Sequence, residues 1–342
     1  MTERLDDRAF LGAHDGGGML DVILSSPERW REGLAWREDM RIALADIEAT
    51  GVVVCGMGGS GIAGDVLAAI ASTRSAIPVV VVKGFDLPAW VGEGALVICV
   101  SYSGDTDETV LCAEAAIRSG ARVIVIAHGG RLADIAERSG SAHIVPGPAG
   151  LMPRAALPSL ASAVLAIGER AGCVPDLAEL EKDALDALAE GLRMWGPDSP
   201  AARNEAKTLA AQIVDRSPAI WGQEGVLAVA AMRFKGQLNE NAKMLASWAV
   251  VPEALHNEIV AAADAPCIVV LRSATERESI ERRIQALGMD NVIEARALGE
   301  GDLAVLASAA LFGDLVSVYC AALRGVDPTP IEPIRRLKSA LG

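Results

Sequence analysis

The sequence predicts an α/β fold in which two doubly wound, mainly parallel sheets follow one another along the chain. Short apolar segments recur about every 20–30 residues in the first half and are separated by stretches of helical character. These apolar segments are continuous rather than alternating, which is typical of strands buried on both faces of a parallel sheet. A second series of the same kind follows the chain-breaking stretch GPDSP at 196–200.

The first series predicts five strands with helices between them. The predicted strands are VVVCGM at 52–57, PVVVVK at 78–83, ALVICVS at 95–101, RVIVIA at 122–127 and AHIVPG at 142–147. Helical character is strongest at 61–72, 105–119 and 131–139. This alternation of strand and helix is the pattern of a doubly wound sheet.

The second series is less regular and predicts four further strands. These are PAIWG at 218–222, SWAVVP at 247–252, CIVVLR at 267–272 and NVIEAR at 291–296. We therefore expect an N-terminal helical extension at 1–40, a first domain at 41–172, a helical connector at 173–194 and a second domain at 195–342.

The composition favours small-molecule partners over polyanions. The 342 residues are enough for two domains, each with its own core. The formal net charge of −14 would repel nucleic acid or an anionic membrane surface at long range. Phosphate binding by such an acidic chain would depend on local amides and hydroxyls.

Neither secretion nor a membrane span is expected. The N-terminal sequence MTERLDDRAF lacks the basic region and apolar core of a signal peptide. The stretch from Leu303 to Leu323 is long enough to cross a bilayer, but it carries Asp314 near its centre, where a charge is costly in lipid. We expect a helix buried between a sheet and a neighbouring subunit.

The six cysteines lie far apart, without a C-x-x-C pair or a cluster with histidine. This usage is typical of small buried thiols in a reducing compartment, so we expect a cytoplasmic protein. It also offers no recognisable metal-binding pattern.

The stretch VVVCGMGGSGIAGD at 52–65 runs from a strand into a glycine-rich turn. Gly56, Gly58 and Gly61 match the G-x-G-x-x-G spacing of a dinucleotide-binding turn, and Asp86 follows the next strand, where a ribose-binding acid would lie. Alone, the same glycines also fit an ordinary tight turn between strand and helix. Ser60 adds a hydroxyl, which suits a sugar phosphate equally well.

A second loop favours the sugar phosphate. The stretch SYSGDTDET at 101–109 places Ser101, Ser103 and Thr106 after the third strand. In one common doubly wound order, strands one and three are neighbours and the ligand lies beyond their carboxyl ends. Helix amides and hydroxyls there could surround the three oxygens of a terminal phosphate. Taken singly, such residues are more often plain N-caps.

These two loops closely resemble the paired phosphate loops of the sugar isomerase (SIS) domain, and more narrowly those of the bifunctional phosphoglucose/phosphomannose isomerase family. That family has two SIS domains in tandem, so the resemblance covers the chain from about residue 20 onward. It implies isomerisation of glucose 6-phosphate, and of mannose 6-phosphate, with fructose 6-phosphate through a cis-enediol, without a metal or cofactor. The implied phosphate-binding residues are Gly59, Ser60, Ser101, Ser103 and Thr106.

The resemblance also implies an acid–base pair. Glu240, in RFKGQLNENAKMLA at 233–246, matches the family's catalytic glutamate, and His256, in EALHNEI, matches its ring-opening histidine. In related isomerases this histidine comes from the neighbouring subunit, which implies a homodimer. Without the resemblance, Glu240 would be a surface residue paired with Lys243. His128 follows the fourth predicted strand and could reach the same sheet edge, so it competes with His256.

Two cations complete the implied site. Arg154, in GLMPRAALPS at 150–159, matches the family's P-R-A motif and would stabilise the enediolate; its structural alternative is a domain-bridging ion pair. Lys338, in the C-terminal stretch, resembles an active-site lysine, although Arg335 and Arg336 lie nearby and basic residues also suit a helix C-terminus.

Three other functions remain open from the sequence: a phosphosugar-binding regulatory protein, an isomerase of another phosphosugar and a dinucleotide-dependent oxidoreductase. A regulatory protein needs the hydroxyls but has no use for Arg154, Glu240 and His256 together. This set therefore favours an enzyme.

Overall fold

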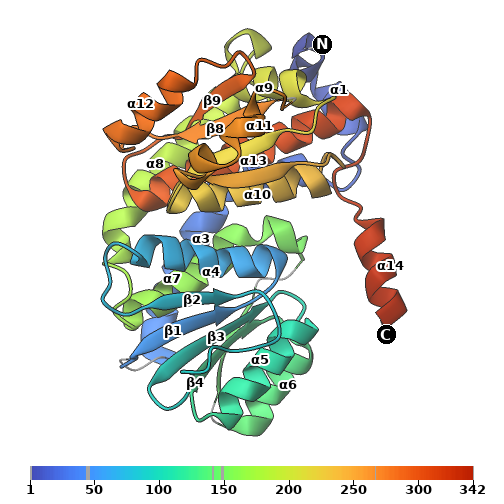
Figure 1. Ribbon diagram of the computed structural model, residues 1–342. Helices are drawn as coiled ribbons and strands as arrows, with labels where there is room; N and C mark the ends of the chain where they lie inside the picture. Colours follow the sequence, from blue (N-terminus) through green and yellow to red (C-terminus); the bar gives the residue numbers. More distant parts are fainter. Residues whose placement is uncertain (1, 44–46, 141, 148–149, 266, 342) are drawn as a thin grey trace. The chain divides into compact units, whose positions relative to one another are not determined.

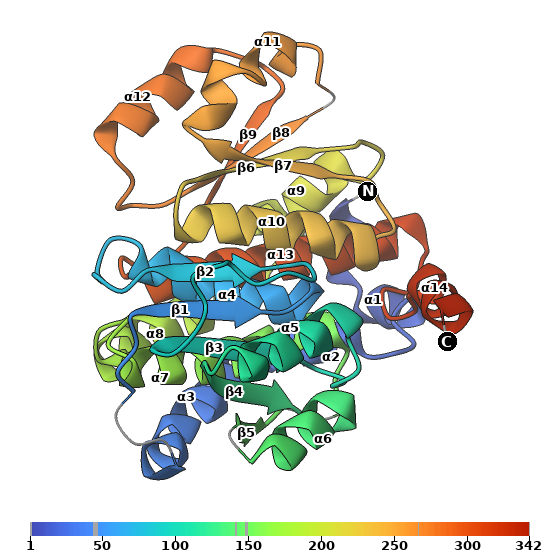
Figure 2. The same ribbon diagram turned by 60° about the horizontal axis from the view of Figure 1, so that its bottom comes forward.

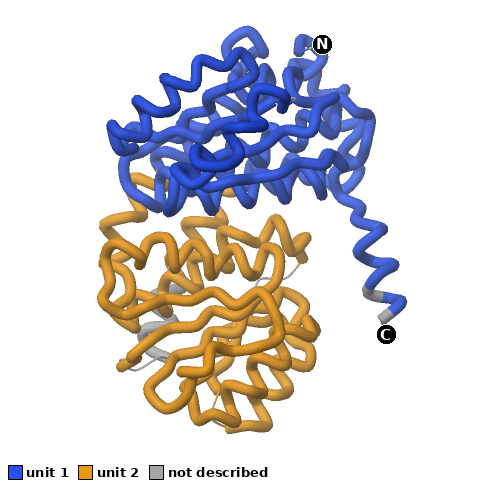
Figure 3. Tube along the Cα trace, viewed as in Figure 1, with its two compact units in different colours: residues 1–25, 186–342 blue, residues 26–185 orange. Residues whose placement is uncertain are grey.

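The computed structural model describes residues 2–43, 47–140, 142–147, 150–265 and 267–341. The chain forms two compact units, shown in Figure 3. Unit 1 consists of residues 1–25 and 186–342, and unit 2 consists of residues 26–185.

This division differs from the predicted boundaries at the N-terminal extension and the connector. Leu5 and Leu20 are buried in unit 1, whereas Trp30 and Leu34 are buried in unit 2, so the extension at 1–40 is shared between two cores. The connector helix, α8 (Leu177–Trp195), likewise crosses the boundary at residue 186. Each helix of the N-terminal extension belongs to the core that buries its apolar side chains.

Unit 2 is built on five strands, shown with their helices in Figures 1 and 2. Its strands are β1 (Gly51–Cys55), β2 (Val79–Val82), β3 (Ala95–Ser101), β4 (Arg122–Ala127) and β5 (Ala142–Pro146). Its helical elements are α3 (Ser26–Ala43), α4 (Gly58–Ala71), α5 (Asp107–Arg118), α6 (Gly130–Ser139), η2 (Pro153–Ala155), α7 (Leu157–Arg170) and the beginning of α8.

All neighbouring strands of this sheet are parallel, in the order β2-β1-β3-β4-β5. Helix α4 packs on one face, where Val54 contacts the helix at Gly64, and α7 packs against α4. Helices α5 and α6 cover the other face (Figure 2). The sheet is therefore doubly wound, as the continuous apolar segments predict.

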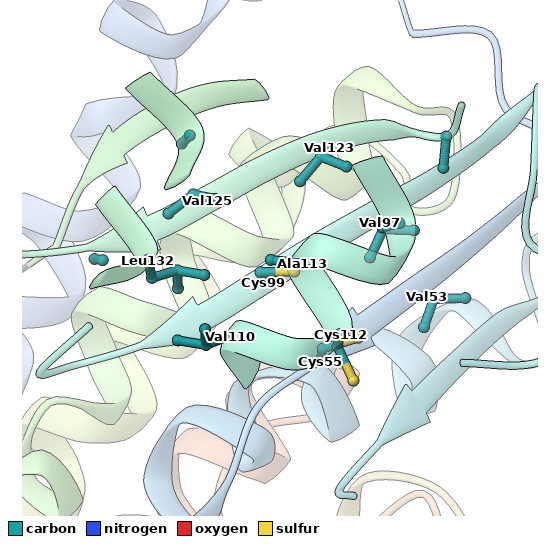
Figure 4. Packing of buried hydrophobic residues seen from close by; sticks show 14 of the residues in the cluster. Val53, Cys55, Val97, Cys99, Val110, Cys112, Ala113, Val123, Val125 and Leu132 are labelled. Carbon is teal, nitrogen blue, oxygen red and sulfur yellow. The ribbon is translucent and has the colours of Figure 1, made fainter. Parts of the chain in front are cut away.

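The core under α5 and α6 contains three of the six cysteines (Figure 4). Cys99 lies opposite Ala113, and Cys55 lies beside Cys112. All six thiols are free and buried, as the sequence predicts. Burial raises the pKa of the Cys173 thiol to about 11, which keeps it protonated and unreactive at neutral pH.

Unit 1 is built on four strands: β6 (Ala219–Gln223), β7 (Ser247–Val251), β8 (Ile268–Arg272) and β9 (Val292–Arg296). Its larger helices are α9 (Glu205–Ile213), α10 (Val226–Glu240), α12 (Glu278–Leu287), α13 (Asp302–Arg324) and α14 (Glu332–Leu341). Its shorter helical elements are η1 (Thr2–Asp6), α1 (Arg8–Ala13), α2 (Met19–Leu24), η3 (Ala201–Arg203), η4 (Glu253–His256) and α11 (Ile259–Ala262).

The second sheet is also parallel throughout, in the order β7-β6-β8-β9. Helix α10 packs on β6 and β7 and against α13, while α11 and α12 cover the opposite face (Figure 1). The prediction of two parallel-sheet α/β domains in tandem is confirmed, and each predicted strand lies within two residues of an observed one.

Helix α13 is the apolar segment that the sequence analysis weighed as a membrane span. It is long and apolar enough to cross a bilayer, but 94% of its most apolar window is buried inside the protein. Asp314 lies among buried polar partners rather than in an apolar surrounding. The helix is therefore a core element of unit 1.

Candidate active site

The carboxyl ends of β1 and β3 lie side by side in unit 2, because the two strands pair in parallel with Cys55 opposite Cys99. Two loops follow them: the glycine loop (residues 56–61) and the hydroxyl loop (residues 101–106). The sheet order confirms the predicted reversal of winding between strands one and three.

The glycine loop is a tight turn that leaves the start of α4 open. A Cβ atom at Gly56 would lie 2.9 Å from the carbonyl oxygen of Val100, and one at Gly61 would lie 2.5 Å from that of Gly56. Gly58 has a positive φ of 53°. The N-cap residue Met57 makes no side-chain hydrogen bond to the helix, so the first amides of α4 and the positive end of its dipole suit an anion.

Hydrogen bonds connect the hydroxyl loop to the glycine loop. The Ser60 hydroxyl accepts a hydrogen bond from the Tyr102 backbone N–H at 3.3 Å. Ser101 Oγ lies 3.0 Å from Thr106 Oγ1 and accepts from the Gly104 N–H at 3.0 Å. The hydroxyls of Ser101 and Thr106 thus lie within hydrogen-bond distance of each other, and Ser60 is joined to the same loop through the backbone of Tyr102.

The hydroxyl loop also contains Ser103, the fourth predicted hydroxyl, and Thr106, whose alternative role is that of a plain helix cap. Ser103 is exposed, and its Oγ accepts from the Asp105 N–H at 3.3 Å. Thr106 occupies the N-cap position of α5 but makes no side-chain cap hydrogen bond. A plain capping role therefore does not account for Thr106.

The backbone segment that carries Arg154 also contacts the glycine loop. It is buried, with 4% of its surface exposed, and it belongs to η2, which packs against α4. A Cβ atom at Gly59 would lie 2.8 Å from the Pro153 carbonyl oxygen and 3.4 Å from the Arg154 Cα. Glycine at 59 is therefore required for the close approach of the arginine-bearing backbone to the glycine loop.

Beside the hydroxyl loop, Arg131 pairs with two acidic residues, which no sequence pattern indicated. Arg131, at the start of α6, donates to the Asp107 carboxylate at 2.5 Å, and its backbone N–H donates to the Asp105 carboxylate at 3.0 Å. The hydrogen bond with Asp107 raises the pKa of Arg131. Arg131 thus offsets two acids that would otherwise oppose an anion at this loop.

A second missed pair lies at the first turns of α4. Lys83, at the end of β2, donates to Asp65 at 2.5 Å, and its Cε atom lies 3.1 Å from the position of a Cβ at Gly61. Burial raises the pKa of the Asp65 carboxyl, and the hydrogen bond from Lys83 opposes this shift. Only the folded backbone shows that this lysine lies along the glycine loop.

Asp86, the candidate ribose-binding acid, and His128, the competitor of His256, are both exposed. Asp86 lies in the loop after β2, and His128 follows β4, one strand beyond the hydroxyl loop. Among the hydrogen bonds found for the described residues, none links either side chain to the glycine loop or the hydroxyl loop.

In unit 1, a buried polar network fixes the helix that ends at Glu240. Arg233 and Gln237 on α10 donate to the two oxygens of Asp314 on α13, at 2.7 and 2.8 Å. Asn241 donates to Ser317 one turn further along, at 2.9 Å. Glu240 lies seven residues after Arg233, so it lies on the same side of α10, half-buried at the helix end.

Lys243, the expected helical partner of Glu240, contacts backbone groups at the end of α10. Lys243 lies beyond the end of α10 with a positive φ of 55°. Its ammonium donates to the backbone carbonyl of Glu240 at 2.6 Å and to that of Pro328 at 3.1 Å. Lys243 therefore holds the end of α10 against the segment that follows α13.

His256 lies at the opposite edge of the unit 1 sheet from Glu240. It ends η4, which follows the carboxyl end of β7, and it is exposed beside a cavity of about 370 Å³ lined also by Ile259 and Arg283. Helix α10 begins at the carboxyl edge and runs back for about 20 Å before it reaches Glu240. The fold of unit 1 thus keeps these two residues of one chain apart.

Lys338 lies on α14, whose backbone is described, whereas its side chain is outside what the structure describes. Of the predicted residues, unit 2 brings together Gly59, Ser60, Ser101, Thr106 and Arg154, with Ser103 in the same loop. Glu240, His256 and Lys338 lie on three different elements of unit 1.

Comparison with known proteins identifies the family. Residues 202–341 match the model of the bacterial phospho-glucose isomerase C-terminal SIS domain. The bifunctional phosphoglucose/phosphomannose isomerase of Caldicellulosiruptor bescii is 31% identical over 335 residues, covering 94% of this chain and 98% of the relative. The enzyme of the same name from Aquifex aeolicus is 32% identical, covering 85% of this chain and 90% of the relative.

A solved structure shows the same fold at lower sequence similarity. The C-terminal domain of glucosamine-fructose-6-phosphate aminotransferase from Francisella tularensis has a TM-score of 0.70 at 16% identity, covering 90% of this chain and 96% of that domain. The similarity extends over nearly the full length of the chain and of its relatives, and the chain belongs to the bifunctional phosphoglucose/phosphomannose isomerase family.

Proposed function

We propose that this protein interconverts glucose 6-phosphate and mannose 6-phosphate with fructose 6-phosphate. The observation that carries the proposal is the paired loop structure of unit 2. An uncapped helix start and the hydroxyls of Ser60, Ser101 and Thr106 lie on two hydrogen-bonded loops, and the backbone that carries the buried Arg154 contacts the glycine loop. The names of the full-length relatives support the choice of substrates.

In this proposal, the two loops hold the phosphate of the sugar. The N–H groups at the start of α4, near Gly59, and the hydroxyls of Ser60, Ser101, Ser103 and Thr106 would donate to its three terminal oxygens. The hydroxyls now bond to each other and to backbone amides, and each can rotate its proton toward a bound oxygen.

Glu240 would then act as the base for the sugar's carbon acid. Its carboxylate removes the proton from C2 of the open-chain aldose and returns it to C1, while a proton passes from O2 to O1. Arg154 would stabilise the negative charge that develops on the enediolate oxygens, and Lys338 would add a second cation. Proton transfer of this kind needs neither a metal nor a redox cofactor.

His256 would open the sugar ring from a neighbouring subunit. Because Glu240 and His256 of one chain lie at opposite edges of the unit 1 sheet, a second copy is the simpler source of the histidine. We therefore propose a homodimer whose active site lies at or near the subunit interface.

The same proposal covers both aldoses. Glucose 6-phosphate and mannose 6-phosphate differ only at C2, which becomes planar in the enediol. Such an enzyme would serve glycolysis and gluconeogenesis. The cytoplasm is the proposed location, because the six buried cysteines are free.

The test is a coupled assay of chelator-treated protein converting fructose 6-phosphate to glucose 6-phosphate, run beside the mannose 6-phosphate reaction. Activity with both substrates would support the proposal. Binding without turnover would indicate the regulatory protein. Turnover of only another phosphosugar, such as an amino sugar, would move the protein to a different isomerase, and bound nicotinamide absorbance would indicate the oxidoreductase.

A further inference from the structure

Tyr102 lies between two of the proposed phosphate-binding serines and has a hydrogen bond at each end. Its backbone N–H donates to Ser60 in the first turn of α4, at 3.3 Å. Its side-chain hydroxyl accepts from the Leu151 N–H at 2.6 Å, which is the shorter of the two bonds. One residue of the hydroxyl loop thus contacts both the glycine loop and the backbone that leads to Arg154.

The segment held by Tyr102 is short and well defined. The Ala155 N–H donates to the carbonyl of Met152, the N-cap residue of η2, at 2.8 Å. Leu151 immediately precedes this N-cap, and Arg154 lies three residues beyond Leu151. A shift of the Leu151 backbone would therefore be transmitted to the Arg154 Cα within one turn.

The third side of this arrangement is the contact between α4 and η2. Gly59 approaches the Pro153 carbonyl so closely that a Cβ atom there would lie 2.8 Å away. Hydroxyl loop, glycine loop and arginine segment (residues 150–155) therefore contact each other pairwise, and Tyr102 supplies two of the three contacts.

We propose that Tyr102 is a positioning residue that connects the phosphate site to Arg154. Phosphate bound by Ser60 and the hydroxyl loop fixes the Tyr102 backbone, and the tyrosine hydroxyl holds the arginine segment at the distance that the enediolate requires. This inference rests on the proposed function. It predicts that loss of the hydroxyl impairs the chemical step more than phosphate binding.

The first test compares the only two tyrosines of the chain. Tyr102→Phe removes the hydroxyl that accepts from Leu151 and keeps the ring. Tyr319→Phe is the matched control, because the Tyr319 hydroxyl donates to the Trp195 carbonyl at 2.8 Å inside unit 1, where no proposed site residue is involved. Thermal unfolding of both variants is measured in parallel with their kinetics.

For Tyr102→Phe we expect kcat to fall by about tenfold or more, while KM and the inhibition constant of inorganic phosphate change less than about twofold. Tyr319→Phe should lower the unfolding temperature and leave kcat unchanged. A kcat of Tyr102→Phe within twofold of wild type would overturn the proposal. So would a change confined to KM and phosphate affinity, since that pattern belongs to a phosphate contact.

The second test asks whether Tyr102 acts through Arg154. Tyr102→Phe is added to Arg154→Ala, and we expect kcat of the double variant to stay within about twofold of Arg154→Ala alone. A further tenfold loss in this background would overturn the connection. An inactive wild-type protein would contradict the proposed function and this inference together, whereas an active wild type with an unaffected Tyr102→Phe contradicts this inference alone.

Discussion

Each unit has a central pair of parallel strands, β1 and β3 in unit 2 and β6 and β8 in unit 1. The side chains at the carboxyl ends of the two pairs are very different. At the carboxyl edge of β1 and β3, unit 2 has hydroxyls and a buried arginine that approaches from η2. At the corresponding edge of β6 and β8, unit 1 has Arg272, which is only 1% exposed. Arg272 Nε donates to both carboxylate oxygens of Glu276 at 2.8 Å, and its Nη1 lies 2.7 Å from Glu294.

The starts of the two helices are alike, so they do not explain the difference. Helix α10 follows Gly225, which has a φ of 92° and provides no side-chain cap, just as α4 follows an uncapped Met57. An open helix start is therefore present at both edges. The loops that follow the strands differ. After β3, the hydroxyls of Ser101 and Thr106 lie within hydrogen-bond distance of each other, whereas at the end of β8 the carboxylates of Glu276 and Glu294 pair with Arg272.

Unit 1 instead offers its proposed base at the other edge of its sheet. Glu240 ends α10 beside the segment after α13, where Lys243 donates to the backbone carbonyl of Pro328. One fold thus provides the proposed phosphate-binding edge in unit 2 and a helix-end carboxylate in unit 1. The repeated scaffold fixes where backbone groups lie, and individual side chains determine what each edge can do.

The largest expected effect concerns the carboxylate of unit 1. Glu240→Gln keeps the size of the side chain and removes the base, so we expect kcat to fall by about 10³- to 10⁴-fold. Affinity for inorganic phosphate should stay unchanged, because the proposed phosphate-binding residues belong to unit 2. Retention of most of the isomerase activity would refute the assignment of the base.

The next effect concerns the carboxyl edge of β6 and β8 in unit 1, where Arg272 is buried. Arg272→Met leaves Glu276 as an uncompensated buried charge, and we expect the free energy of unfolding to fall by about 3–5 kcal/mol. The double variant Arg272→Met with Glu276→Leu should recover much of this loss. Urea unfolding measures both, and a substantial weakening of phosphate binding in the folded double variant would show that this edge binds ligand after all.

A smaller effect should distinguish the Ser101 hydroxyl of unit 2 from the Ser273 hydroxyl of unit 1. Ser101→Ala should raise KM for fructose 6-phosphate about tenfold, which corresponds to about 1.4 kcal/mol of a hydrogen bond to a charged group. Ser273→Ala removes a similarly buried hydroxyl that follows β8, and it should change KM less than twofold. Equal effects of the two substitutions would break the comparison.

The smallest expected effect concerns the ion pair between Asp6 and Lys207 in unit 1 and its dependence on pH. The hydrogen bond from buried Lys207 lowers the pKa of Asp6 below its usual 3.8, so this group adds stability above that pH and loses the contribution as the pH falls through the folded pKa. Asp6→Asn should therefore cost up to about 1 kcal/mol at pH 7, since the carboxylate is 40% exposed, and less below pH 3.

Urea unfolding at the two pH values measures this difference. Asp198→Asn, which removes the exposed partner of Arg8, is the control and should show a smaller loss at pH 7. A destabilisation by Asp6→Asn that is the same at both pH values would contradict the assigned ion pair.

Much of the fold follows from local sequence patterns. Apolar segments at 95–101 and 122–127 coincide with β3 and β4 because continuous burial on both faces requires continuous apolar side chains. The meeting of Ser60 with the hydroxyl loop was predictable for a related reason, since parallel neighbours end at the same edge.

The remaining features depend on contacts between distant residues. Tyr102 and Leu151 are 49 positions apart, and Lys83 lies 18 positions from Asp65, so no local pattern pairs them. The division of the N-terminal helices between two cores is similarly invisible, because a short helix with an apolar face carries no information about which core it joins.

The most direct measurement is a crystal structure of Glu240→Gln with fructose 6-phosphate bound. The account predicts the phosphate at the carboxyl edge of β1 and β3, within hydrogen-bond distance of Ser60, Ser103 and the first amides of α4. A phosphate at the edge of β6 and β8 beside Arg272, or one bound away from both phosphate loops, would contradict it.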